Sequence, residues 1–239
     1  MRRLWSGFTI IETTLVVAIT ALVAISILVG IGTSLRNQQY IDATNQTVDY
    51  FQGIYAHTMS VSNERPSAVA CSSSGVESDA TAGGAGTSGC LLLGVILHST
   101  DGMTITSSRV IATEDISTDP NSGLYSEADI LSKSLLSVLP GSDTAHTLDW
   151  GVKLSHPEFS MLVIRVPISG VVRTYLDTTS GDVTPALLSK TPVPVGGVTF
   201  CIEPEGLFGS SGSPNGFLVD QGASNSTGIQ QLDKGTCTP

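Results

Sequence analysis

The most constraining feature of this 239-residue chain is a long apolar segment near its N-terminus. The sequence from Phe8 to Ile31 is almost continuously apolar, and Glu12 is the only charged residue between Arg3 and Arg36. As a helix, a segment of this length extends about 36 Å, which is enough to cross a hydrocarbon core of about 30 Å. The segment therefore predicts a membrane-spanning helix.

Two ordinary interpretations of this segment are a plain signal anchor and a cleaved secretory signal. Gly30 and Gly32 would supply the small residues before a secretory cleavage site. However, the apolar stretch is longer than the roughly 7–15 residues typical of such signals. Arg2 and Arg3 precede the segment and only Arg36 follows it, an asymmetry that favours a cytoplasmic N-terminus and an exported C-terminal domain.

Glu12 is the residue of this segment that requires a functional explanation. An ionisable side chain costs about 2.5–3.5 kcal/mol at the membrane centre and less near the end, so it indicates a function by default. The segment itself contains no Lys, Arg or His that could pair with it. If the chain were cut before Phe8, the new α-amino group would lie four residues, about one helical turn, before Glu12. That cation could neutralise the carboxylate within a chain or between neighbouring chains.

The string Ser6-Gly7-Phe8-Thr9-Ile10-Ile11-Glu12, followed by the apolar run, resembles the N-terminus of a type IV pilin or pseudopilin precursor. The resemblance covers residues 1 to about 40. It implies cleavage by a prepilin peptidase after Gly7, methylation of Phe8, and a role for Glu12 in assembly. It also implies an inner-membrane, single-pass subunit that membrane assembly machinery packs with other pilin subunits into a filament at the cell surface. Such a filament (fimbrium) would serve adhesion, motility, DNA uptake or secretion.

The rest of the chain is polar and acidic, with a net charge of −10 and 25 glycines. This charge argues against a basic nucleic-acid surface, and removal of a leader with two arginines would make it −12. A local DNA-binding patch using Arg165, Arg173 or Lys190 stays open. Glycine has no triplet period and charged residues are few, which excludes collagen-like and coiled-coil chains.

The sequence predicts four segments: a leader at residues 1–7, a membrane and assembly helix at 8–31, a continuing amphipathic helix at 32–63, and an exported β-rich domain at 64–239. The continuing helix is indicated by apolar residues at helical spacing: Ile41, Val48, Phe51, Tyr55 and Met59. Pro66 predicts its end near Ser62 or Asn63. We expect an α+β fold, a helix packed on a mainly antiparallel sheet, which the pilin resemblance also implies.

Short runs typical of strands follow Pro66. They are residues 68–71, 91–98, 104–112, 147–154, 159–168, 171–177, 198–203, 217–220 and 229–232. The fifth and sixth runs predict a hairpin with a two-residue turn at Ser169-Gly170. Ser126 predicts the start of a further helix that stops at Pro140; its apolar face would comprise Leu131, Leu135, Val138 and Leu139.

All four cysteines lie in the predicted exported domain: Cys71, Cys90, Cys201 and Cys237. An even count in such a domain predicts disulfide bonds, and sequence proximity favours Cys71–Cys90 and Cys201–Cys237 among the three connectivities. Zinc binding is disfavoured because no C-x-x-C spacing occurs. In many pilins a C-terminal region bounded by a disulfide helps form the exposed surface.

No pattern of catalytic or metal-binding residues is present in the sequence. The four histidines are scattered, and G-x-S-x-G, H-E-x-x-H and phosphate-binding motifs are absent, so we expect no enzymatic activity, cofactor or metal. A loose similarity to minor pseudopilins of the H type around 70–75 and 89–90 favours a minor subunit. The leading hypothesis is therefore a structural subunit of a type IV pilus or related pseudopilus. The alternative is a signal-anchored extracytoplasmic adhesin or enzyme that does not polymerise.

Overall fold

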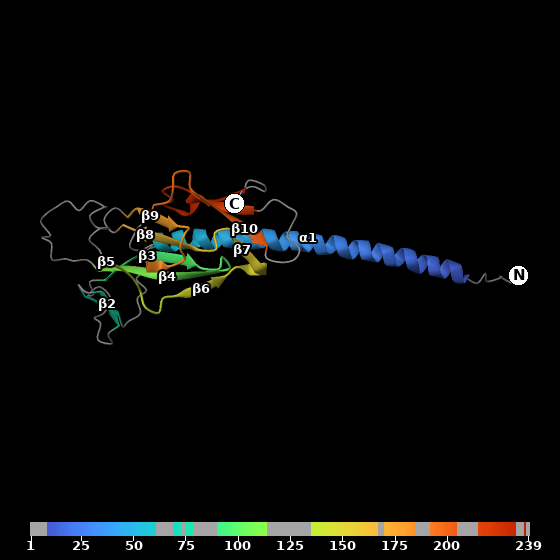
Figure 1. Ribbon diagram of the computed structural model, residues 1–239, viewed down its shortest axis with the longest axis horizontal. Coiled ribbons are helices and arrows are strands. Elements are labelled where there is room, and N and C mark those ends of the chain that lie inside the picture. The colour runs from blue at the N-terminus through green and yellow to red at the C-terminus, as the bar shows by residue number, and fades with distance from the viewer. Residues whose placement is uncertain are drawn as a thin grey trace. The chain divides into compact units, whose positions relative to one another are not determined.

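The computed structural model describes residues 9–60, 69–72, 75–78, 90–113, 135–166, 170–184, 192–204, 215–232 and 237. Helix α1 (Ile10–Met59) is followed by antiparallel strands (Figure 1), so the predicted α+β fold is confirmed. The chain divides into two compact units, Met1–Asp42 and Ala43–Pro239. Helix α1 contributes to both of them.

The strands of the second unit form three antiparallel groups. The described strands are β1 (Val69–Ser72), β2 (Gly75–Ser78), β3 (Cys90–Ser99), β4 (Thr104–Thr113), β5 (Leu135–Val138), β6 (Thr144–Thr147), β7 (Val152–Leu154), β8 (Phe159–Arg165), β9 (Val172–Asp177), β10 (Val198–Pro204), β11 (Asn215–Val219) and β12 (Ile229–Leu232). The larger sheet has the order β5-β4-β3-β8-β9, with β6 also paired to β4. The smaller sheet has the order β12-β11-β10-β7, and β1 pairs with β2. Two short 3-10 helices, η1 (Asp149–Gly151) and η2 (Ser226–Gly228), precede β7 and β12.

The C-terminal part of α1 belongs to the second unit and presents an apolar stripe to the strands of that unit. Val48, Phe51 and Tyr55 are buried as the periodicity predicts, whereas Met59 is half exposed. The stripe therefore ends one turn earlier than predicted. The helix itself ends at Met59, a few residues before the predicted stop.

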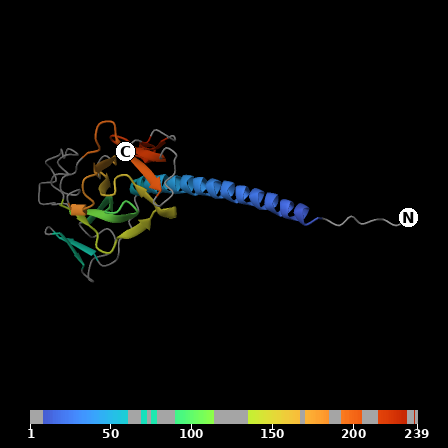
Figure 2. The ribbon, with the colours of Figure 1, turned by 45° about the vertical axis from the view of Figure 1, so that its right-hand side comes forward.

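Four phenylalanines join this part of α1 to both sheets. The ring of Phe51 lies 6.2 Å from Phe159 of β8, 6.2 Å from Phe200 of β10 and 4.8 Å from Phe217 of β11. The rings of Phe200 and Phe217 stack at 5.2 Å. Figure 2 shows this part of α1 between the strands of the smaller sheet and those of the larger sheet. We call these four side chains the phenylalanine cluster; all four are fully buried.

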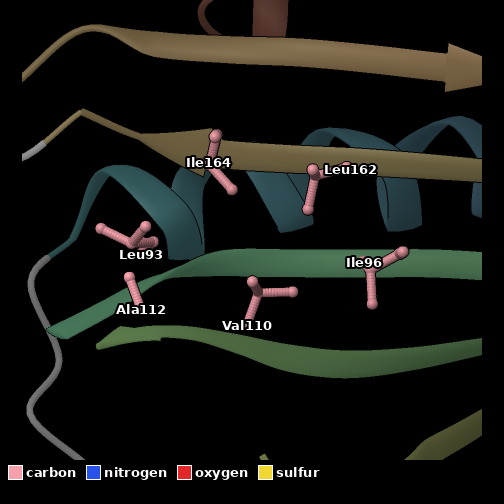
Figure 3. Close-up of a cluster of buried hydrophobic side chains, with 6 residues drawn as sticks. All are labelled: Leu93, Ile96, Val110, Ala112, Leu162 and Ile164. Carbon is pink, nitrogen blue, oxygen red and sulfur yellow. The ribbon is translucent and has the colours of Figure 1, made fainter. Parts of the chain in front are cut away.

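The central strands of the larger sheet, β3 and β8, are buried on both faces. One face meets α1 through Phe159, and a second apolar cluster lies on the opposite side of the same strands (Figure 3). Its members come from β3, β4 and β8: Leu93, Ile96, Val110, Ala112, Leu162 and Ile164. This explains why β3 and β8 are continuous apolar runs, since a strand that is covered on both faces has no polar side.

Gly94 allows β3 and β8 to pair beside a bulge. The β3–β4 register shifts between Leu92 and Gly94, and Gly94 pairs with Ile164. A methyl group at Gly94 would collide with the carbonyl oxygen of Val163 and lie 2.8 Å from the Cα of Ile164. Glycine is therefore required here by the close approach of two backbones.

Tyr55 connects α1 to the edge strand of the larger sheet. Its hydroxyl lies 2.7 Å from Thr174 Oγ1, which itself donates to the carbonyl oxygen of Ala223 at 2.7 Å. Tyr55 is thus the donor in the first bond. Burial, offset in part by the hydrogen bond with Thr174, raises the pKa of Tyr55 from 10.0 to about 12.

We expect the raised pKa of Tyr55 to make the fold sensitive to alkali. Because the unfolded chain loses this proton first, the contribution is complete below pH 10 and is lost as the pH rises from 10 to about 12. The loss should reach about 3 kcal/mol. Denaturant unfolding of the wild type between pH 9 and 12 measures it, with Tyr55→Phe as the control. A Tyr55→Phe variant that loses as much stability over this range as the wild type would contradict the assignment.

The predicted helix ending at Pro140 is wrong where the structure describes it. Residues 135–138 form β5, which pairs with β4, and Leu136 and Val138 pack against the second apolar cluster. The alternation of these two side chains has the period of a strand, and the sheet contact prevails over local helix propensity. The start of that predicted helix, around Ser126, lies outside the described residues.

The predicted hairpin and one predicted strand also differ in detail from the structure. The hairpin of β8 and β9 is confirmed, but Arg165 pairs with Val172 and the N–H of Val166 donates to the carbonyl of Val171, so the loop has four residues instead of two. Gly170, at φ +68°, takes the last loop position.

The single strand predicted over 147–154 is instead β6, η1 and β7, interrupted by a left-handed backbone at Trp150 and Gly151.

Candidate membrane and assembly segment

The N-terminal part of α1 is apolar around its whole circumference. All side chains from Thr9 to Ile31 are exposed, with Ile10 83% and Leu28 69% accessible. By length and composition, this helix is able to cross a membrane. A helix that is apolar on every side requires lipid or other protein around it, and the described residues of this chain do not supply that cover.

The helix begins at a capping motif that the sequence analysis missed. Thr9 precedes the first helical residue, and its Oγ1 accepts a hydrogen bond from the N–H of Glu12 at 3.3 Å. The spacing Thr-x-x-Glu is the capping-box pattern, so Thr9 and Glu12 could have been recognised as a helix start. A carboxylate in the first turn is also favoured by the helix dipole, by about 0.3–1 kcal/mol.

The hydroxyl groups of this segment are satisfied within the helix. They donate to carbonyl oxygens three or four residues back, at 2.8 to 2.9 Å: Thr13 to Ile10, Thr14 to Ile11, Thr20 to Val16 and Ser26 to Leu22. Such bonds leave no unsatisfied hydroxyl in lipid. The carboxylate of Glu12 differs, because no side chain of the described residues donates to it or forms an ion pair with it.

Gly30 and Gly32 do not interrupt the helix. Both lie within the continuous run of α1, and a Cβ added at either position would meet no atom within 4 Å. Glycine costs about 1 kcal/mol relative to alanine at each position. The helix is continuous through both glycines, and each position has room for a larger side chain.

The predicted processing residues, Gly7 and Phe8, lie outside the described residues. Cys71 and Cys90 fall on β1 and at the start of β3. Their side chains are also outside the description, so the Cys71–Cys90 pairing stays a prediction.

Cys201 and Cys237 form a disulfide bond, the pair that sequence proximity favours. Their Cα atoms lie 5.6 Å apart and both residues are buried. Cys201 of β10 pairs with Gly216 of β11, and a methyl group at Gly216 would approach Cys237 Sγ to 2.5 Å. The disulfide therefore packs directly on the smaller sheet, at a place where glycine makes room for it.

The candidate basic residues do not form one patch among the described strands. Arg173 pairs across the hairpin with Ile164, and Arg165 pairs with Val172, so the two arginines point to opposite faces. Lys190 is outside the described residues. Within the described ranges no three His, Cys, Asp or Glu side chains come close enough to hold a metal ion.

Comparison of the whole chain with known protein families, curated proteins and solved structures gives no significant match.

Proposed function

We propose that this chain is a structural subunit of a type IV pilus or a related pseudopilus. The observation that carries the proposal is the largely apolar surface from Thr9 to Ile31, which is exposed on every side and contains Glu12 as its only charged residue. A plain anchor needs the apolar surface but not the acid. A subunit that leaves the membrane to pack with its neighbours needs both. Helices in lipid gain no hydrophobic free energy by associating, so close packing and polar pairs must select the partner.

The proposed sequence of events begins with cleavage after Gly7 and methylation of Phe8. The α-ammonium group created at Phe8 would precede Glu12 by four residues, the number in about one helical turn. In the filament core, the carboxylate would pair with a neighbour's α-ammonium in a medium of low dielectric constant. Leaving it unpaired there would cost several kcal/mol, so the pair would set orientation and register.

N-terminal sequencing of the membrane-extracted chain tests this proposal. A chain that begins with Phe8, especially if methylated, supports a pilin. A chain that begins with Met1 indicates a permanent anchor, as in a non-polymerising adhesin or enzyme. A chain that begins with Thr33 indicates a secretory signal. The last two results would overturn the proposal.

We expect Gly7→Val to block the cleavage, because the bulky side chain would occupy the position before the scissile bond. The variant should accumulate as the full precursor in the membrane, with a shift in electrophoretic mobility that corresponds to the seven-residue leader. Ser6→Ala, one residue earlier, is the control and should be processed normally. A Gly7→Val chain that is shortened like the wild type would contradict the assigned cleavage site.

A further inference from the structure

Trp150 is a large apolar side chain held in solvent by an unfavourable backbone. It is 59% exposed and has φ +61°, the only positive φ of a non-glycine residue in the described chain. It is followed by Gly151 at φ +66°, and the turn is closed by the N–H of Val152 donating to the carbonyl of Asp149. The left-handed conformation is unfavourable for a bulky residue, whereas Asn, Asp or Gly accept it readily. Strain of this kind, with nothing buried in return, indicates a contact outside the chain.

The position of Trp150 is fixed by its neighbours. Leu148 and Val152, on either side of the turn, are 3% and 1% exposed. The N–H of Leu148 donates to the carbonyl of Met103 at 2.8 Å. The exposure of the indole is therefore a property of the folded unit.

A second exposed apolar site lies on the loop before β10. Val195 is 86% exposed, in a turn closed by the N–H of Gly197 donating to the carbonyl of Pro194 at 2.9 Å. Pro192 and Pro194 are also exposed, while Val193 is buried and anchors the loop. Outside α1, Trp150 and Val195 are the only exposed large hydrophobic residues in the described part of the chain.

The two sites lie at opposite ends of β10. Val195 is three residues before Val198, where β10 begins. Val152, which directly follows the Trp150 turn, pairs with Pro204, where β10 ends. A strand of this length extends about 20 Å, so the two sites of one chain cannot meet each other.

The charges around the two sites favour a contact between Trp150 of one copy and the Val195 loop of another over a symmetric contact of two Trp150 side chains. Asp149 is exposed beside Trp150, so a symmetric contact of two Trp150 side chains would bring two carboxylates together. The segment from Pro192 to Ile202 carries no charge, so it can approach Asp149 without repulsion. This matters for a chain of net charge −10, whose copies repel each other at long range.

We infer that Trp150 of one subunit packs on the Pro192–Val195 loop of the next subunit. This inference rests on the proposed function and specifies a contact between neighbouring globular units. A contact between two different surfaces is heterologous, and such contacts build open helical assemblies when they do not close into rings. An indole buries at most about 150–250 Å², far below the roughly 1,600 Å² of a stable interface. The contact therefore acts together with helix packing and fixes how neighbouring units are rotated.

Cross-linking within sheared filaments tests this contact. In a chain carrying Trp150→Cys and Val195→Cys, a short bismaleimide should join successive subunits into a ladder of covalent oligomers on denaturing gels. Each single-cysteine variant is the control and should remain monomeric. Dimers from Trp150→Cys alone would indicate a symmetric contact and overturn the inference. Filaments that contain the double variant but give no ladder would overturn it as well, while leaving the proposed function intact.

Trp150→Asn separates assembly from folding. Asparagine accepts the left-handed backbone, so the thermal unfolding midpoint should stay equal or rise, while the amount of chain in sheared filaments falls several-fold. Unchanged filament incorporation would overturn the inference. If the wild-type chain never enters filaments, whether or not its leader has been cleaved before Phe8, the proposed function fails. The inference then fails with it.

Discussion

Replacing Glu12 with leucine should leave membrane insertion and cleavage after Gly7 intact but prevent assembly. The substitution makes the segment more apolar, and Glu12 lies beyond the cleavage site. The neighbour's α-ammonium would then lack its partner in the filament core. Breaking one side of a buried ion pair costs about 3–5 kcal/mol, which corresponds to a loss of about two to nearly four orders of magnitude in incorporation. Immunoblots of the sheared and membrane fractions measure this loss.

Thr13→Val is the matched control for Glu12→Leu. It removes a polar group from the adjacent position, but the Thr13 hydroxyl already donates to the carbonyl of Ile10 within the helix. Incorporation of this variant should be close to that of the wild type. Normal incorporation of Glu12→Leu would show that the carboxylate serves only the helix start, with Thr9 as its cap.

Removing the Cys201–Cys237 disulfide should cause the largest loss of fold stability. The bond closes a separation of 36 residues, and the loop-entropy relation gives about 4 kcal/mol for that length. Urea unfolding of the detergent-solubilised chain, followed by far-UV circular dichroism, should show this difference between the wild type and Cys201→Ala/Cys237→Ala.

Ser226→Ala, in the η2 turn before β12, is a control without a cross-link and should unfold with the wild type. A loss of less than about 1 kcal/mol in the double variant would contradict the loop-entropy account. In that case, the disulfide and its packing on Gly216 would contribute little to the free energy of unfolding.

The elements predicted best are those whose sequence pattern coincides with their burial. The apolar stripe of Phe51 and Tyr55 has the helical period and is buried. The strand predicted at 229–232 is β12 with the same limits. In these segments local pattern and tertiary contact favour the same structure, so the sequence alone is sufficient.

The errors arise where a tertiary contact or a backbone angle decides. Leu135–Val138 has apolar residues that suit one face of a helix, yet pairing with β4 makes it a strand. The interruption of the strand predicted over 147–154 depends on the left-handed angle of Trp150, a residue type that gives no turn signal. The N-cap at Thr9 is different, because the pattern Thr-x-x-Glu is visible in the sequence and is sufficient to predict it.

The phenylalanine cluster also constrains when the chain can fold. Phe51 reaches Phe217 and Phe159 reaches Phe200, contacts that join parts of the chain synthesised far apart in time. Contacts of such long sequence separation slow folding, because the entropy of closing large loops is lost before the contacts form. The C-terminal part of α1 therefore has no complete packing partner until nearly the whole chain has been made. The apolar N-terminal part, which needs none of these contacts, is free to enter a membrane first.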